Sequence, residues 1–130
     1  MSAIVVAYVP GAVGRAALAA GVAEARQRQV ELIVVNSTRG DALVDARFLQ
    51  GPAVEELRDQ LAALDVPAEL RQVSGGLDIA EDLNRIATEV DAVLVVIGIR
   101  HRTAVGKLIL GSAASRILLT VRRPILAVKP

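Results

Sequence analysis

The sequence predicts a single α/β domain of the doubly wound class, with a five-stranded parallel sheet covered by helices on both faces. The alternation of short apolar runs with helical segments and the length of the chain support this prediction. Five short apolar runs rich in β-branched residues alternate with four segments of helical periodicity, which gives the order βαβαβαβαβ. Parallel strands joined by right-handed crossovers form an open twisted sheet with helices on both sides. The 130 residues suit one domain, over residues 1–130.

The five predicted strands mostly lack a clean alternation of apolar and polar residues, as expected of strands buried on both faces. Pro67 and Pro124 stand where the third and fifth runs begin, a position in which proline does not interrupt an interior hydrogen-bond ladder. The runs are 3–9 (AIVVAYV), 30–36 (VELIVVN), 68–73 (AELRQV), 91–98 (DAVLVVIG) and 124–129 (PILAVK).

Four helices are predicted from apolar residues spaced three or four apart. Asp78 follows a glycine-containing turn and is placed to cap the third helix. Ser112 is the expected N-cap of the last helix, over residues 113–121. The apolar positions are Leu18, Val22 and Ala25; Val54, Leu57, Leu61 and Leu64; Ile79, Leu83, Ile86 and Val90; and Ala114, Ile117, Leu118 and Val121.

Composition excludes several classes of function. Fifteen basic and fourteen acidic residues give a net charge near zero (+1), which does not favour nucleic-acid binding, and one Phe, one Tyr and no Trp leave almost no base-stacking surface. A lone histidine and no cysteine exclude disulfides, thiolate sites and a histidine-based zinc site within one chain. The apolar runs are too short to span a bilayer and no secretory signal is recognisable, so we expect a soluble, cytoplasmic protein.

The segment from Gly98 to Ser112 is the candidate ligand site. In open α/β sheets, ligands bind outside the carboxyl ends of the strands, and a phosphate there needs glycines and a helix amino terminus. Gly111 and Ser112 precede the last predicted helix. Two interpretations stay open: a phosphate cradle, or an ordinary turn followed by a helix cap. Positive charge is added by Arg100, His101, Arg102 and Lys107.

Three other patterns are less informative. The stretch 101–108 (HRTAVGKL) has His101 and Leu108 where a Walker A loop requires Gly and Ser or Thr. The stretch PGAVGRA, after the first predicted strand, lacks the glycine spacing of a dinucleotide fingerprint, and the second predicted strand ends in Asn36 instead of an acidic residue. The long connection 36–52 is either a ligand cover or a surface excursion.

Three stretches of the chain resemble the universal stress protein family: IVVAYVPGAVGRAALAAGVAEA, IAEDLNRIATEVDAVLVVIG and GKLILGSAASRILLTVRRPILAVKP. The resemblance covers nearly the whole chain and implies an adenine nucleotide alpha hydrolase-like fold with strand order 3-2-1-4-5. The nucleotide-binding motif of that family is G-x2-G-x9-G-[ST]. Gly98, Gly111 and Ser112 match it, whereas His101 occupies the second glycine position.

The resemblance implies binding of ATP or another adenine nucleotide, with any Mg2+ carried in by the nucleotide, at the carboxyl ends of the first and fourth strands. Val9 stands where ATP-binding members typically have an acidic residue, so backbone groups near Val9 and from Asn36 to Thr38 are left to contact the base. His101 either crowds the phosphates or, when protonated, donates to them. The candidate binding residues are Val9, Pro10, Asn36, Gly98, Arg100, His101, Gly111, Ser112 and Ala113.

The expected mode of action is nucleotide-dependent association with at most slow hydrolysis, because no general base or acidic metal ligand follows Asp91. The alternatives are a nucleotide-free dimeric interaction module and, less consistent with the few aromatic residues, a flavin-binding domain. The resemblance also implies a homodimer through the C-terminal strand. Arg122, Arg123 and Pro130 are equally ordinary protectors of a sheet edge, which leaves a monomer open.

Overall fold

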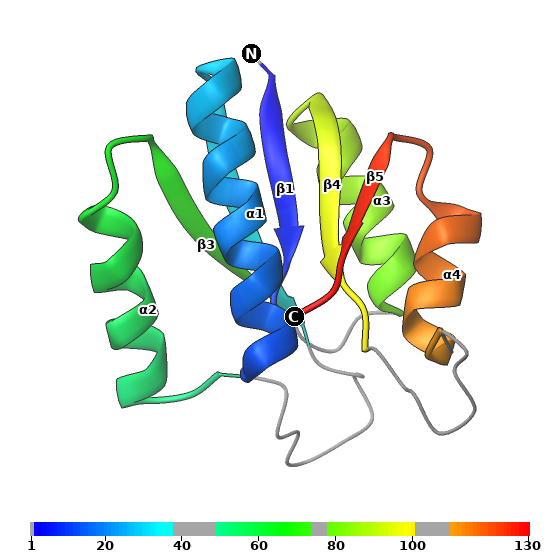
Figure 1. Cartoon of the computed structure of the whole chain (residues 1–130), viewed down its shortest axis with the longest axis horizontal. Coiled ribbons are helices and arrows are strands. Elements are labelled where there is room, and N and C mark those ends of the chain that lie inside the picture. The colour runs from blue at the N-terminus through cyan, green and yellow to red at the C-terminus, as the bar shows by residue number, and fades with distance from the viewer. Residues whose placement is uncertain (1, 38–48, 74–77, 101–109) are drawn as a thin grey trace.

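The computed structural model describes residues 2–37, 49–73, 78–100 and 110–130 of the chain. Its strands form one parallel sheet in the order β3-β2-β1-β4-β5 (Figure 1). This topology confirms the predicted fold class and the strand order that the resemblance implied. The strands are β1 (Ala3–Ala7), β2 (Glu31–Ser37), β3 (Ala68–Val73), β4 (Ala92–Gly98) and β5 (Ile125–Val128).

Strand boundaries differ from the predicted runs by at most two residues. The first strand ends at Ala7 instead of residue 9, the second is shifted by one residue, and the third agrees. The fourth begins at Ala92, because Asp91 has a left-handed backbone (φ 52°) that a strand cannot contain. The fifth begins after Pro124, whose carbonyl group accepts a hydrogen bond of 2.9 Å from the Val95 N–H.

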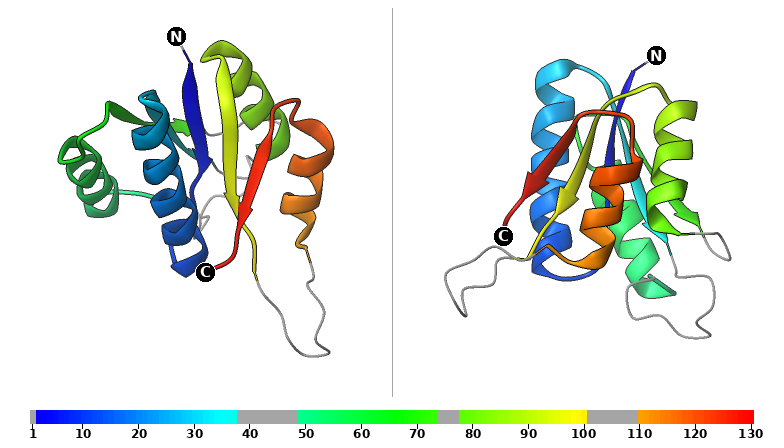
Figure 2. Two further views of the ribbon diagram at one scale, coloured as in Figure 1. Left: turned by 45° about the horizontal axis from the view of Figure 1, so that its top comes forward. Right: turned by 90° about the vertical axis from the view of Figure 1, so that its right-hand side faces the viewer.

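Helices cover both faces of the sheet, and each face has its own hydrophobic core. Figure 2 shows α1 and α3 on opposite sides of the strands. One core joins α1 and α2 to Ile4, Val6 and Val34, and the other joins α3 and α4 to Val5, Val35 and Val95. No helix of the described residues is long and apolar enough to cross a membrane. The helices are α1 (Ala12–Arg28), α2 (Pro52–Ala62), α3 (Ile79–Glu89) and α4 (Ser112–Thr120).

The last helix departs in part from its predicted apolar face. Ile117 and Val121 are buried as expected, but Leu118 is 41% exposed; Leu119, which was not assigned to this face, is 87% exposed. The reason is the position of α4 at the margin of the sheet, where it packs on α3 and contributes few residues to the core. A short marginal helix therefore leaves part of its apolar surface uncovered.

The first turn of α1 lies against the ends of β1 and β4, and two glycines make this close approach possible. A Cβ atom added at Gly14 would lie 1.6 Å from the carbonyl oxygen of Val9. A Cβ atom added at Gly98, the last residue of β4, would lie 2.4 Å from the carbonyl oxygen of Val13. Gly98 thus has a packing reason to be glycine, which neither interpretation of the sequence included.

We predict that alanine at Gly14 or Gly98 destabilises the fold, because backbone atoms of a packed turn cannot move aside as a flexible side chain can. Each variant should lower the free energy of unfolding by at least about 1–3 kcal/mol, measured by urea denaturation. Gly111→Ser is the matched control: no atom lies within 4 Å of its Cβ position, and its φ of −66° suits any residue. Equal stability of Gly98→Ala and wild type would contradict this packing argument.

Candidate functional site

The candidate site lies at the carboxyl edge of the sheet, between β1 and β4. The chain leaves β1 toward β2 and β3 on one side and returns through α3 to β4 on the other, so the strand order reverses between β1 and β4. Ligands of open α/β sheets bind at such a switch point. The amino termini of α1 and α4 are both at this edge (Figure 1).

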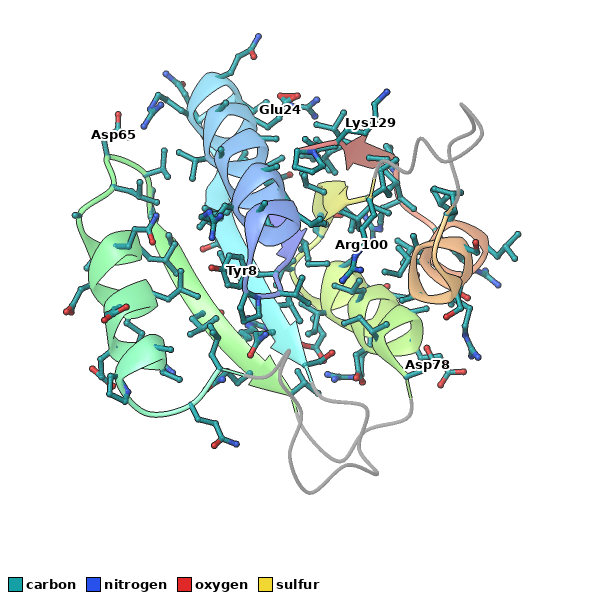
Figure 3. All side chains as sticks on the ribbon, turned by 60° about the horizontal axis from the view of Figure 1, so that its bottom comes forward. Tyr8, Glu24, Asp65, Asp78, Arg100 and Lys129 are labelled. Carbon is teal, nitrogen blue, oxygen red and sulfur yellow. The ribbon has the colours of Figure 1, made fainter. Side chains whose placement is uncertain are left out.

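A hollow of about 420 Å³ opens beside the first turn of α1. It contains three of the predicted binding residues, Val9, Pro10 and Arg100. Figure 3, which is turned to bring this edge forward, shows Arg100 between α1 and α4. Arg100 is exposed and forms no ion pair within the described part of the chain. The remaining lining residues are Gly11, Ala12, Val13 and Pro130.

The amino terminus of α1 carries no negative charge of its own. Its N-cap is Gly11, whose backbone (φ 111°, ψ −176°) lies in a region that is essentially restricted to glycine. Gly11 has no side chain to cap the helix, and no acidic residue stands in its first turn. The free N–H groups of this turn and the positive end of the helix dipole are therefore not neutralised by the helix itself.

The amino terminus of α4 has the same character, and it corrects one prediction. The N-cap is Gly111 instead of Ser112, because the Gly111 carbonyl group accepts the first helical hydrogen bond from the Ser115 N–H at 3.0 Å. Ser112 is the first helical residue, and neither it nor Ala113 is buried. Gly111 has no side chain to cap α4, and the first turn of the helix has no acidic residue. Neither packing nor backbone conformation requires glycine at position 111.

The amino terminus of α3 is different, because it is neutralised within the protein. Asp78 caps α3 as predicted, accepting a hydrogen bond of 3.0 Å from the Glu81 N–H. Glu81 and Asp82 add negative charge to the first turn. The second carboxylate oxygen of Asp78 pairs with Arg116 of α4. This ion pair links the middle of α4 to the start of α3.

Asn36 is buried at the end of β2, and its side chain is committed to hydrogen bonds within the fold. Its amide nitrogen donates to the Tyr8 carbonyl oxygen at 3.0 Å, and its amide oxygen accepts from the Leu49 N–H at 2.9 Å. This side chain belongs to the support of the site. Contact of a base with backbone groups near Asn36 remains a prediction.

Several predictions lie outside the described residues. They concern His101, with Arg102 and Lys107, and the backbone of Thr38. Within the described ranges, no group of three or more His, Cys, Asp or Glu side chains is arranged to hold a metal ion.

Sequence reasoning missed the contribution of the first turn of α1. Gly11, Ala12 and Val13 line the hollow, although PGAVGRA was set aside for lacking the dinucleotide spacing. The available signal was the pair Gly11 and Gly14 directly after the first strand. One of these glycines takes a left-handed backbone and the other allows helix and strand to touch.

Comparison with known proteins shows the family of the chain. The model of the universal stress protein family matches residues 1–129. A universal stress protein of Mycolicibacterium smegmatis is 49% identical over 127 residues, which cover 98% of this chain and 97% of the relative. A universal stress protein structure from Archaeoglobus fulgidus has 29% identity and a TM-score of 0.77, with 99% of each chain covered.

A second Archaeoglobus fulgidus structure, of the universal stress protein in complex with dAMP, is 25% identical with a TM-score of 0.69. The match covers 99% of this chain and 98% of that one. Family model, sequence relative and solved structures thus agree over essentially the full length of the described domain. The chain belongs to the universal stress protein family.

Proposed function

We propose that this protein binds an adenine nucleotide at the switch point between β1 and β4, with the phosphate groups directed toward the amino termini of α1 and α4. The observation that carries the proposal is that both helix termini lack a capping side chain and a first-turn acid, while Arg100 stands between them. A related structure holds dAMP, which supports the same ligand class here.

The physical basis is electrostatic. Each helix amino terminus acts as about half a positive elementary charge, and its free N–H groups point at an incoming anion. Arg100 adds a full charge that is not committed to a carboxylate of the described residues. The hollow beside α1 offers aliphatic surface from Val9, Pro10 and Val13 for the base or the ribose. Gly111 leaves open space next to the α4 terminus, where a phosphate oxygen needs it.

The proposed activity is binding that controls association, with at most slow hydrolysis, in the cytoplasm. Both AMP-like nucleotides and ATP are candidate ligands, and any Mg2+ would arrive with the phosphate groups of the nucleotide. His101 is expected either to crowd or to contact the phosphates. A nucleotide-free interaction module is the alternative, and the following experiment decides between the two.

Arg100→Gln should weaken nucleotide binding, because it removes one positive charge from the phosphate region. We expect the Kd for AMP or ATP, measured by equilibrium dialysis, to rise about tenfold, with a smaller dependence on salt. Gly111→Val should abolish binding by filling the phosphate space. Arg122→Gln is the matched control. Arg122 lies between α4 and β5, at the amino ends of the strands, and its side chain forms no ion pair among the described residues. No binding by the wild type would favour the alternative.

We also propose a homodimer through β5. The two outer strands of the sheet, β3 and β5, differ in whether charged side chains oppose pairing with another chain. The β3 edge carries Glu69 and Arg71, which form an ion pair, and hydrogen bonding to Glu69 raises the pKa of Arg71. The β5 edge consists of Ile125, Leu126, Ala127 and Val128 and carries no charge. Charged side chains on an edge oppose pairing with another chain, and their absence favours it.

Ala127→Pro should convert a dimer to a monomer. The carbonyl groups of Pro124 and Val128 accept hydrogen bonds from β4, so in a parallel ladder the backbone of Ala127 faces the open edge. Proline there removes an outward donor and leaves the pairing with β4 intact. Analytical ultracentrifugation should give a mass near 13.6 kDa for the variant and twice that for the wild type. A monomeric wild type would refute the proposed dimer.

A further inference from the structure

Two amide side chains, one buried and one half-buried, join β2, β3 and the residue that follows β1 at the carboxyl edge. Asn36 of β2 and Gln72 of β3 are register partners on adjacent strands. The Gln72 amide nitrogen donates to the Asn36 amide oxygen at 3.3 Å and to the Leu49 carbonyl oxygen at 2.8 Å. The Asn36 amide group itself bonds the Leu49 N–H and the Tyr8 carbonyl oxygen. We call Asn36 and Gln72 the amide clamp.

Where the sheet ends, side chains of the clamp form the hydrogen bonds to backbone groups that a neighbouring strand would otherwise form. Leu49 is not in a strand, yet both its N–H and its carbonyl group are bonded by clamp side chains, and it is 7% exposed. Buried backbone groups without partners would cost about 1–3 kcal/mol each, so the clamp stabilises the chain entering α2. The hydrogen bonds from the clamp to Leu49 therefore have a structural role.

The remaining bond of the clamp holds Tyr8, the residue that follows β1. Tyr8 is held from both of its backbone groups: its N–H donates to the Val35 carbonyl oxygen at 2.8 Å, and its carbonyl group accepts from Asn36 at 3.0 Å. Val9 and Pro10, which line the hollow, follow directly, and Figure 3 shows Tyr8 beside α1. Beyond Tyr8, Val9 lies against Gly14 of α1. Among the described residues, the Asn36 bond therefore ties a side chain to the backbone directly before the β1 side of the hollow.

We infer that Asn36 is a positioning residue of the nucleotide site, which sets the place of Val9 and Pro10 through the Tyr8 carbonyl group. The inference rests on the proposed function. The position needs a donor toward Tyr8 and an acceptor toward Leu49 at once, and the Asn36 amide group supplies both. Gln72 shares the clamp but does not contact Tyr8, so it separates positioning of the site from support of the fold.

The test compares Asn36→Ala with the matched control Gln72→Met. For Asn36→Ala we expect the Kd for AMP to rise about tenfold in equilibrium dialysis, the loss typical when a group that orients contacting residues is removed. For Gln72→Met we expect lower thermal stability but a Kd within about twofold of wild type, because the bond to Tyr8 is kept. If Asn36→Ala does not fold, Asn36→Asp is the second variant: it keeps the acceptor toward Leu49 and, when ionised, lacks the donor toward Tyr8.

A measurement without ligand accompanies the dialysis. Tyr8 is the single tyrosine and the chain has no tryptophan, so intrinsic fluorescence reports on Tyr8 alone. Acrylamide should quench this fluorescence more strongly in the Asn36 variant than in wild type and equally in Gln72→Met. Unchanged affinity and quenching in the Asn36 variants, with normal binding by the wild type, would overturn the inference alone. A wild type that binds no nucleotide would overturn the proposed function and this inference with it.

Discussion

The contact of the first turn of α1 with the ends of β1 and β4 is the constraint on which the rest of the structure depends. It requires the absence of a side chain at Gly14 and at Gly98, because the nearest atoms are backbone carbonyl oxygens. With this contact in place, α1 covers the switch point and points its amino terminus at the carboxyl edge. The same contact that closes the core therefore creates the wall of the hollow.

The charge distribution at this edge follows from the way the helices begin. Asp78 neutralises the start of α3 and pairs with Arg116, whereas Gly11 and Gly111 begin α1 and α4 without a capping side chain. The starts of α1 and α4 therefore add no negative charge of their own at this edge. Of the two glycines that match the family motif within the described residues, Gly98 is required by packing and Gly111 is not. Because packing does not explain the glycine at position 111, Gly111 is the stronger indication of a ligand at this edge.

Periodicity and strand composition were sufficient to predict the fold class and every element, because buried parallel strands and amphipathic helices leave strong local signals. Boundaries were less predictable, since Asp91 and Gly111 take their roles from backbone angles that composition does not reveal. At the site, Val9, Pro10 and Arg100 line one hollow, and their role in binding stays a prediction. The support of Asn36 by Gln72 and Leu49 could not be predicted, because it depends on register between strands that are distant in sequence.

The most direct test of the central claim is an NMR titration of the ¹⁵N-labelled protein with AMP. If the switch point is the binding site, the largest amide shift changes should occur at Gly11, Val13, Arg100 and the first turn of α4. The amino terminus of α3, neutralised by Asp78, should change little. Changes confined to α2 or to the opposite edge of the sheet, or no changes at millimolar AMP, would contradict the account.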